Sequence, residues 1–326
     1  MKTKSSDINQ LEEGIKNGNR VALSQAITLA ESSLSKHQKQ AHDLIQRLLP
    51  LTGQSKRIAI TGVPGVGKST FIEGFGKLLV DKGFKVAVLA IDPSSTLSKG
   101  SILGDKTRME DLSREENAYI RPSASSGFLG GIASRTYEAM LLCEAAGFDV
   151  ILIETVGVGQ SETLVNDMTD LFLFLQIPGA GDELQGIKRG IMEMADLIFI
   201  NKVDQFGLNK AKDVKVTLAQ SLYFLPPKAS QWKRKTVIGS GYTGDGLEDC
   251  WELVEKYFEQ IQSNGYLEKR RLEQSQLRIR EYIQEQVIRK TMQLYKEQPI
   301  SSDEIVRQNP YLLAEKWIAE KLGFKE

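Results

Sequence analysis

The stretch Gly62-Val-Pro-Gly-Val-Gly-Lys-Ser-Thr70 decides the fold of this chain. The apolar run from Arg57 to Thr61 precedes it and Phe71-Ile-Glu-Gly-Phe75 follows it, so the order is strand, loop, helix. The spacing matches G-x-x-x-x-G-K-[ST], a loop that binds phosphate between a strand and a helix. Its glycines let backbone N–H groups converge on phosphate oxygens, and the amino end of the helix adds partial positive charge. The alternative is an ordinary glycine-rich turn, which is disfavoured because eight positions match the motif in the correct strand–helix setting.

Each part of this motif has an expected role. Lys68 should reach the β and γ phosphates, and the Ser69 hydroxyl should bind Mg²⁺. The whole motif is expected to surround the nucleotide phosphates, through Gly62, Val63, Pro64, Gly65, Val66, Gly67, Lys68, Ser69 and Thr70.

Composition excludes several classes of protein. The 326 residues carry 42 Lys and Arg against 42 Asp and Glu, so no overall positive charge indicates binding to nucleic acid or to an anionic membrane. No uncharged apolar run reaches the ~18 residues that a membrane span needs. The two cysteines lie far apart, and the amino terminus does not resemble a signal peptide. These observations favour a cytoplasmic protein.

Short apolar runs alternate with helical segments and predict an α/β fold with a doubly wound, mainly parallel sheet. We expect a helical N-terminal extension at 1–50, a P-loop nucleotide-binding domain at 51–262 and a helical C-terminal arm at 263–326. In the extension, Leu23, Ile27, Ala30 and Leu34 have the spacing of one helical stripe. The predicted strands are Ile58–Thr61, Lys85–Ile91, Asp149–Glu154, Leu171–Gln176, Leu197–Asn201 and Thr236–Gly239.

Three carboxylates are candidate magnesium ligands, because Mg²⁺ takes oxygen ligands while it keeps several waters. Asp92 and Glu154 end predicted strands, and Asp105 follows in the loop after the first of these. The alternative for Asp92 is to cap the turn that Pro-Ser begins. The Gly157 N–H is expected to sense the γ-phosphate. The sequence here is Glu-Thr-Val-Gly rather than Asp-x-x-Gly, and Gln160 is not adjacent to Gly157, so intrinsic hydrolysis should be slow.

The tetrapeptide Asn201-Lys-Val-Asp204 follows a predicted strand and indicates a guanine nucleotide. A carboxylate at Asp204 accepts hydrogen bonds from both N1–H and the exocyclic amine of guanine, which adenine does not offer. We expect Ser240, Gly241 and Tyr242, which follow the last predicted strand, to close over the base through backbone contacts. GTP is therefore the expected ligand rather than ATP.

Two further segments indicate contacts beyond the nucleotide. The loop from Pro178 to Lys188 follows a predicted strand, and its two glycines flank the acidic pair that begins at Asp182. This pattern suits a hinge, and Asp182 could equally cap a helix. In the C-terminal arm, an apolar seam runs among basic residues and favours dimerisation. Its members are Leu272, Ile279, Ile283 and Val287.

The motifs GVPGVGKST, DPSS, GSILGDKTRM, RPSASSGFLGG, ETVGVGQSE, PGAGDELQGIKRGIMEMAD and NKVD together resemble the MeaB/ArgK family, the methylmalonyl-CoA mutase-associated GTPases. The similarity runs from about Gly14 to about Leu253. It implies a cytoplasmic, homodimeric G protein that binds GTP, GDP and Mg²⁺. It also implies a chaperone of an adenosylcobalamin-dependent acyl-CoA mutase, which gates cofactor loading and protects the enzyme.

By the same resemblance, the magnesium ion would lie near Ser69, Asp92, Asp105 and Glu154. The loop that contains Asp182 and Lys188 would be an additional switch toward the mutase. A second interpretation of similar sequences is a P-loop kinase that acts on a transport-system binding protein. A metal-insertion GTPase or a signal-recognition GTPase fits less well, since the expected cysteine and histidine clusters or methionine-rich domain are absent from the sequence.

Overall fold

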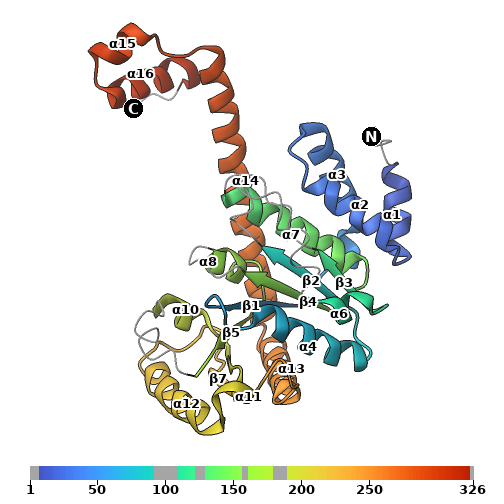
Figure 1. Cartoon of the computed structure of the whole chain (residues 1–326). Coiled ribbons are helices and arrows are strands. Elements are labelled where there is room, and N and C mark those ends of the chain that lie inside the picture. Colours follow the sequence, from blue (N-terminus) through green and yellow to red (C-terminus); the bar gives the residue numbers. More distant parts are fainter. Residues whose placement is uncertain (1–6, 92–108, 122–128, 156–160, 179–188, 324–326) are drawn as a thin grey trace. The chain divides into compact units, whose positions relative to one another are not determined.

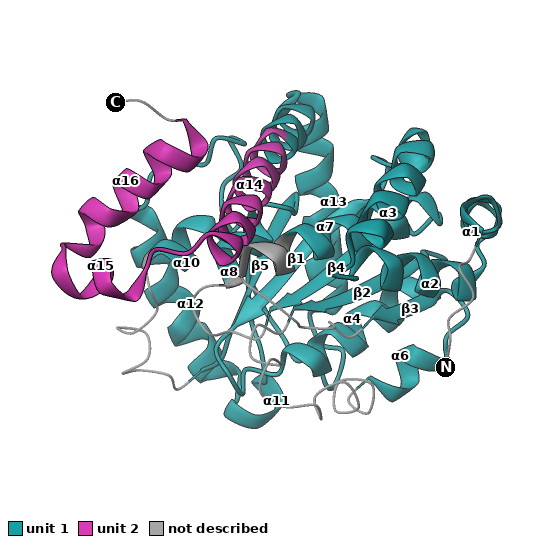
Figure 2. Ribbon diagram, turned by 90° about the horizontal axis from the view of Figure 1, so that it is seen from above, with its two compact units in different colours: residues 1–275 teal, residues 276–326 magenta. Residues whose placement is uncertain are grey.

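The computed structural model describes residues 7–91, 109–121, 129–155, 161–178 and 189–323. The chain divides into two compact units, Met1–Ser275 and Gln276–Glu326, which Figure 2 shows in different colours. The first unit holds the sheet and the helices around it. The second consists of the outer part of one long helix and two short helices.

Seven parallel strands form one sheet in the order β3-β2-β4-β1-β5-β6-β7 (Figure 1). Strand β1 lies in the middle and pairs with both β4 and β5, so that Ile58 lies opposite Leu152 on one side and Leu171 on the other. The chain builds the sheet outward from β1 in both directions, as in doubly wound folds. The strands are β1 Lys56–Gly62, β2 Val86–Ile91, β3 Ala118–Arg121, β4 Val150–Thr155, β5 Leu171–Gln176, β6 Leu197–Ile200 and β7 Lys235–Ile238.

Helices cover both faces of the sheet, and alternate strand residues enter different cores. In β1, Ile58 and Ile60 belong to the core under α4 and α13, whereas Ala59 belongs to the core under α7 and the N-terminal helices. The helices that surround the sheet are α4 Lys68–Asp81, α6 Glu110–Arg114, α7 Leu129–Ala145, α8 Ser161–Asn166, α10 Arg189–Met194, α11 Val203–Phe206, α12 Leu208–Tyr223 and α13 Leu247–Ser263.

Helices before and after the sheet complete the chain. The N-terminal ones pack on α7, where His42 Nε2 lies 3.0 Å from Glu138 Oε1. In the second unit, the indole of Trp317 donates to the carbonyl of Gln298 at 2.8 Å and holds α16 to the end of α14. These helices are α1 Ile8–Lys16, α2 Arg20–Ala30, α3 Ser35–Leu48, the 3₁₀ turn η1 Leu49–Leu51, α14 Tyr266–Glu297, α15 Ser302–Arg307 and α16 Pro310–Leu322.

The predicted α/β fold class is confirmed, and all pairs in the sheet are parallel. Two details differ from the prediction. Strand β3, Ala118–Arg121, was not predicted, because it has four residues at the sheet edge and only its first two are buried. The predicted stripe through Leu34 was wrong at its last member. Helix α2 ends at Ala30, and Leu34 precedes α3 with 59% of its surface exposed.

No helix in the described part of the chain has both the length and the apolarity needed to cross a bilayer.

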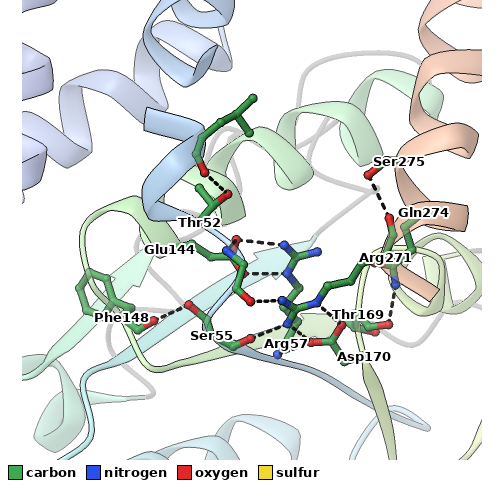
Figure 3. A network of polar contacts seen from close by, with 12 residues as sticks. Thr52, Ser55, Arg57, Glu144, Phe148, Thr169, Asp170, Arg271, Gln274 and Ser275 are labelled. Carbon is green, nitrogen blue, oxygen red and sulfur yellow. Dashed lines mark hydrogen bonds and ion pairs between the residues drawn. The ribbon is translucent and has the colours of Figure 1, made fainter. Parts of the chain in front are cut away.

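Buried charges hold the start of β1 (Figure 3). Arg57, 4% exposed, donates from Nε and Nη2 to both carboxylate oxygens of Glu144 on α7, at 2.8 and 2.9 Å. Asp170 accepts from the Arg57 backbone N–H at 3.1 Å and from Arg271 of α14 at 2.7 and 3.0 Å. Burial opposes the charge of Arg57, but the hydrogen bonds that it donates to Glu144 keep the pKa of Arg57 above its ordinary value. The network therefore joins α7 and the root of α14 to the central strand.

Glu144→Leu should lower the free energy of unfolding by about 3 to 5 kcal/mol, because it leaves the guanidinium of Arg57 buried without its anion. The matched double variant, Arg57→Leu with Glu144→Leu, should lose less, since no unpaired charge remains. Urea unfolding followed by tryptophan fluorescence measures both. A single variant as stable as the wild type, or a double variant less stable than the single one, would contradict this account.

Candidate nucleotide-binding site

The loop between β1 and α4 needs glycine at two positions. Gly62 ends β1, and a Cβ there would lie 2.7 Å from the carbonyl oxygen of Leu175. Gly67 precedes α4 with a φ of 91°, and a Cβ there would lie 3.0 Å from Asn201 Nδ2. Any side chain would disturb the contact of this loop with β5 and β6. The loop therefore brings its backbone against the ends of these strands and begins α4 at Lys68.

Lys68 holds its ammonium group over the loop. Its Nζ donates to the carbonyl oxygen of Gly62 at 2.8 Å and reaches that of Val63 at 3.4 Å. Burial lowers the pKa of Lys68, and the charges of Glu154 and Glu162 oppose this shift. A phosphate beside the ammonium would raise the pKa of Lys68, as these carboxylates do, and would keep the lysine charged. Lys68 is therefore suited to bind phosphate.

Ser69 and Glu154 face each other at the end of β4. The Ser69 hydroxyl donates to Glu154 Oε1 at 3.1 Å, and the Glu154 side chain is 9% exposed. Thr155 donates to Thr61 at 2.7 Å and joins the ends of β4 and β1. A hydroxyl and a carboxylate beside a phosphate-binding loop are oxygen donors of the kind that Mg²⁺ takes. Ser69 and Glu154 therefore have the ligand atoms that the predicted Mg²⁺ requires.

The side chain of Asn201 joins three segments that are distant in sequence. Its Nδ2 donates to the carbonyl of Val66 at 2.9 Å, and its Oδ1 accepts from the N–H of Gly241 at 2.8 Å. The next residue, Lys202, donates from Nζ to the carbonyl of Gly65 at 2.7 Å. It has a φ of 62°, a conformation that costs a non-glycine residue energy and occurs at functional sites. The structure thus fastens Asn201 and Lys202 onto the phosphate-binding loop.

The expected base-binding residues lie near this junction in the chain. Asp204 is the second residue of α11 and is exposed, and no hydrogen bond or ion pair joins its carboxylate to another described residue. Ser240 is buried, and its hydroxyl accepts from the N–H groups of Tyr242 and Thr243 at 3.2 Å each. The loop after β7 lies on α4, since a Cβ on Gly241 would be 2.6 Å from the Cα of Phe71. Since no described residue bonds to the carboxylate of Asp204, that group can accept hydrogen bonds from a ligand.

Not every predicted residue can be placed. Asp92, Asp105, Gly157, Asp182 and Lys188 lie outside the described residues, so their roles stay predictions. Within the described ranges, no group of three or more His, Cys, Asp or Glu residues could hold a metal ion. The magnesium prediction therefore depends here on Ser69 and Glu154.

Sequence reasoning missed three residues of this region. Asn201 and Lys202 are the first two residues of the N-K-V-D motif. This motif identified Asp204 and could have identified them as well. Glu162, the second residue of α8, is buried, and its charge acts on Lys68. It had no signal in the sequence beyond its position shortly after the glycine loop.

Comparison with known proteins agrees with this geometry. The family model of the methylmalonyl Co-A mutase-associated GTPase MeaB matches residues 23–296. A putative GTPase of Caulobacter vibrioides is 54% identical over 82% of both chains, and the GTPase ArgK of Escherichia coli is 46% identical over 84% of this chain and 83% of its own.

Two further proteins are similar over most of this chain. The mouse protein named methylmalonic aciduria type A homolog, mitochondrial, is 44% identical over 86% of this chain and 70% of its own. The crystal structure of an LAO/AO transport system kinase is 35% identical, covers 94% of this chain and 98% of its own, and has a TM-score of 0.75. The phosphate-binding loop, the Asn201 junction and these similarities together show that the chain is a P-loop GTPase and belongs to the MeaB family of methylmalonyl Co-A mutase-associated GTPases.

Proposed function

We propose that this GTPase is the nucleotide-dependent chaperone of an adenosylcobalamin-dependent acyl-CoA mutase, and that it gates cofactor loading and protects the mutase. The observation that carries the proposal is the Asn201 junction, which links the phosphate-binding loop to the N-K-V-D motif in a chain of this family. The family description names a mutase-associated GTPase, and the mouse relative is named after methylmalonic aciduria.

The proposed site divides its work among few residues. The ammonium of Lys68 and the backbone of the loop from Gly62 to Gly67 bind the phosphates, and Asp204 selects guanine. Ser69 and Glu154 would hold Mg²⁺ with its waters. The metal ion would neutralise the charge that develops on the phosphate oxygens. Preorganised positive groups in a partly dry site are the main source of rate enhancement in phosphoryl transfer.

We also propose that the chain forms a homodimer through its helical arm. Exposed apolar side chains recur along the outer part of α14, among them Ile279, Ile283 and Val287, each more than half exposed. A row of this kind stabilises a helix when a second copy covers it.

The proposed partnership can be tested directly. We expect a purified adenosylcobalamin-dependent mutase to form a stable complex with the chain in the presence of a non-hydrolysable GTP analogue, and to raise the rate of GTP hydrolysis. Size-exclusion chromatography with light scattering measures the complex and the dimer. If neither nucleotide state binds any such mutase, the chaperone role is wrong.

A second candidate function is a P-loop kinase that acts on a transport-system binding protein, because the similar crystal structure is described as that of an LAO/AO transport system kinase. Incubation with GTP labelled on the γ-phosphate, together with a substrate-binding protein of a transport system, separates the two. Hydrolysis alone releases all label as inorganic phosphate, whereas a kinase leaves it on protein.

Lys68→Ala should weaken GTP binding by about a hundredfold or more, because it removes the charge that lies over the phosphate-binding loop. The fold should survive. Lys77→Ala changes an exposed lysine of the same helix and is the matched control. Calorimetric titration with GTP and a thermal melt measure affinity and stability together. Equal affinities in the variant and the control would remove this loop from the site.

Asp204→Asn should shift the preference from guanine toward xanthine, because an amide donates to the C2 oxygen of xanthine where the carboxylate accepted from the guanine amine. Competition between GTP and XTP is the measurement. Asp213→Asn, an exposed acid on the neighbouring helix α12, should keep the original preference. An unchanged preference in Asp204→Asn would show that another residue selects the base.

We also propose that the loop from Pro178 to Lys188 couples GTP hydrolysis to the mutase, and Lys188→Ala tests this coupling. Its segment follows β5, and strand ends of this kind border the ligand in doubly wound sheets. We expect GTP binding to stay within about tenfold of the wild type, a change of at most ~1.4 kcal/mol. The acceleration of hydrolysis by the mutase should be mostly lost. Equal acceleration in the variant and the wild type would place the coupling elsewhere.

A further inference from the structure

A groove of about 900 Å³ lies between α12 and the segment Pro227–Thr236, which leads into β7. Strand β7 is the last strand of the sheet, and Figure 1 shows it beside α12. The groove reaches Lys235 and Thr236, the first residues of β7, whereas the nucleotide site lies at the carboxyl ends of the strands. We call it the β7 groove. It is separate from the GTP site.

The β7 groove combines apolar and aromatic surface. Its apolar lining includes Leu222, Pro227 and Trp232. Tyr223 also lines it and is 84% exposed, and its ring lies 5.6 Å from that of Phe224, which is 79% exposed. Two adjacent, exposed aromatic rings beside an apolar groove are typical of a surface that a partner covers.

Positive charge surrounds this surface. The chain as a whole is neutral, but residues 208–236 hold seven lysines and arginines against a single acidic residue, Asp213. Lys215, Lys233 and Lys235 line the groove and are exposed, and none of them forms an ion pair with a described residue. None of the described lining residues is Asp or Glu. The surface is thus complementary to an anionic ligand.

The other two cations of the groove have partners within the fold. Lys228 lies 2.9 Å from Asp196 and donates to the carbonyl of Met194. Arg234 donates to the carbonyl oxygens of Pro226 and Glu193 at 3.0 and 2.9 Å. These contacts fix the floor of the groove. The three exposed lysines remain available to a ligand.

The backbone at the groove favours an extended polypeptide. The N–H of Lys235 donates to the carbonyl of Asp196, directly before β6, at 3.3 Å, and the N–H of Gly239 donates to that of Ile200 in β6 at 2.9 Å. Because strand residues alternate, the main-chain groups of Thr236 point away from β6, toward the open edge of the sheet. An extended segment can bond to such an edge and place alternate side chains in a neighbouring groove.

Backbone strain also marks this groove. Gln231, which lines it, has a φ of 60°. Among the described residues, the only other non-glycine residue with positive φ is Lys202, in the nucleotide site. Strain of this kind persists where the surrounding structure enforces it, and it concentrates at binding sites.

We propose that the β7 groove binds an extended acidic segment of a partner protein. Carboxylates of the segment pair with Lys215, Lys233 and Lys235, and an apolar side chain covers the floor at Trp232. The exposed ring of Tyr223 packs along the segment. Charge steers the approach, and the apolar contact and strand edge set the register.

The proposal can be tested with the full chain and a phage-displayed library of random peptides. Each peptide has about ten residues, which is the length of a long strand. Selection against the wild type should enrich acidic peptides that contain a large apolar residue. Their affinity is then measured by fluorescence anisotropy. A triple variant, Lys215→Glu with Lys233→Glu and Lys235→Glu, should bind them about ten- to a hundredfold more weakly, as the loss of three exposed ion pairs predicts.

The control replaces three exposed lysines outside the groove by glutamate, at Lys77, Lys210 and Lys212. It should bind the selected peptides as the wild type does, and both variants should keep the basal GTPase rate. The proposal would be overturned if the selected peptides were not enriched in acidic residues. It would also be overturned if both triple variants lost the same affinity for the peptides. A single-stranded oligonucleotide that binds as tightly as the peptides and depends on the same three lysines would overturn it too, because the site would then be a nucleic-acid site.

Discussion

The carboxamide of Asn201 is the contact on which the nucleotide site depends. It donates to Val66 in the phosphate-binding loop and accepts from Gly241 in the loop after β7. The loss of one partner of a buried amide costs about 1 to 3 kcal/mol of stability. These two hydrogen bonds therefore stabilise the contact between the two loops. At 2% exposure, Asn201 has both ends of its side chain satisfied by backbone groups. The residue therefore fixes the distance between the phosphate-binding loop and the loop after β7.

The opposite end of β1 uses charge instead. Arg57 and Glu144 form a two-point ion pair in a dry environment, and Asp170 connects the same strand to Arg271. Such pairs stabilise a fold only when every donor and acceptor has a partner, which makes their geometry demanding. The central strand is thus held at its start by ions and at its end by the glycine loop. Both faces of the sheet are covered by helices that these contacts position.

Much of this arrangement was predictable from local sequence. The glycine loop, the apolar runs and N-K-V-D predict a parallel sheet with a nucleotide at its carboxyl edge, because each signal lies within a few residues. Strand β3 was missed because it has four residues, of which only two are buried, and so short a run carries little pattern. The role of Asn201 was missed because it depends on how β6 aligns with β1 and β7, which no local pattern encodes. Arg57 and Glu144, 87 positions apart, resemble surface charges until the fold brings them together.

A net charge of zero gives no information about how charge is distributed over a surface. In this chain Lys215, Lys233 and Lys235 line the β7 groove, and none of the described residues that line it is Asp or Glu. Screening limits such a field to about 10 Å at moderate salt, so each edge of the sheet acts on its own ligand. The carboxyl edge holds the glycine loop and the ammonium group of Lys68. The β7 edge offers lysines around an apolar floor, a combination that suits a flexible acidic chain better than a compact anion.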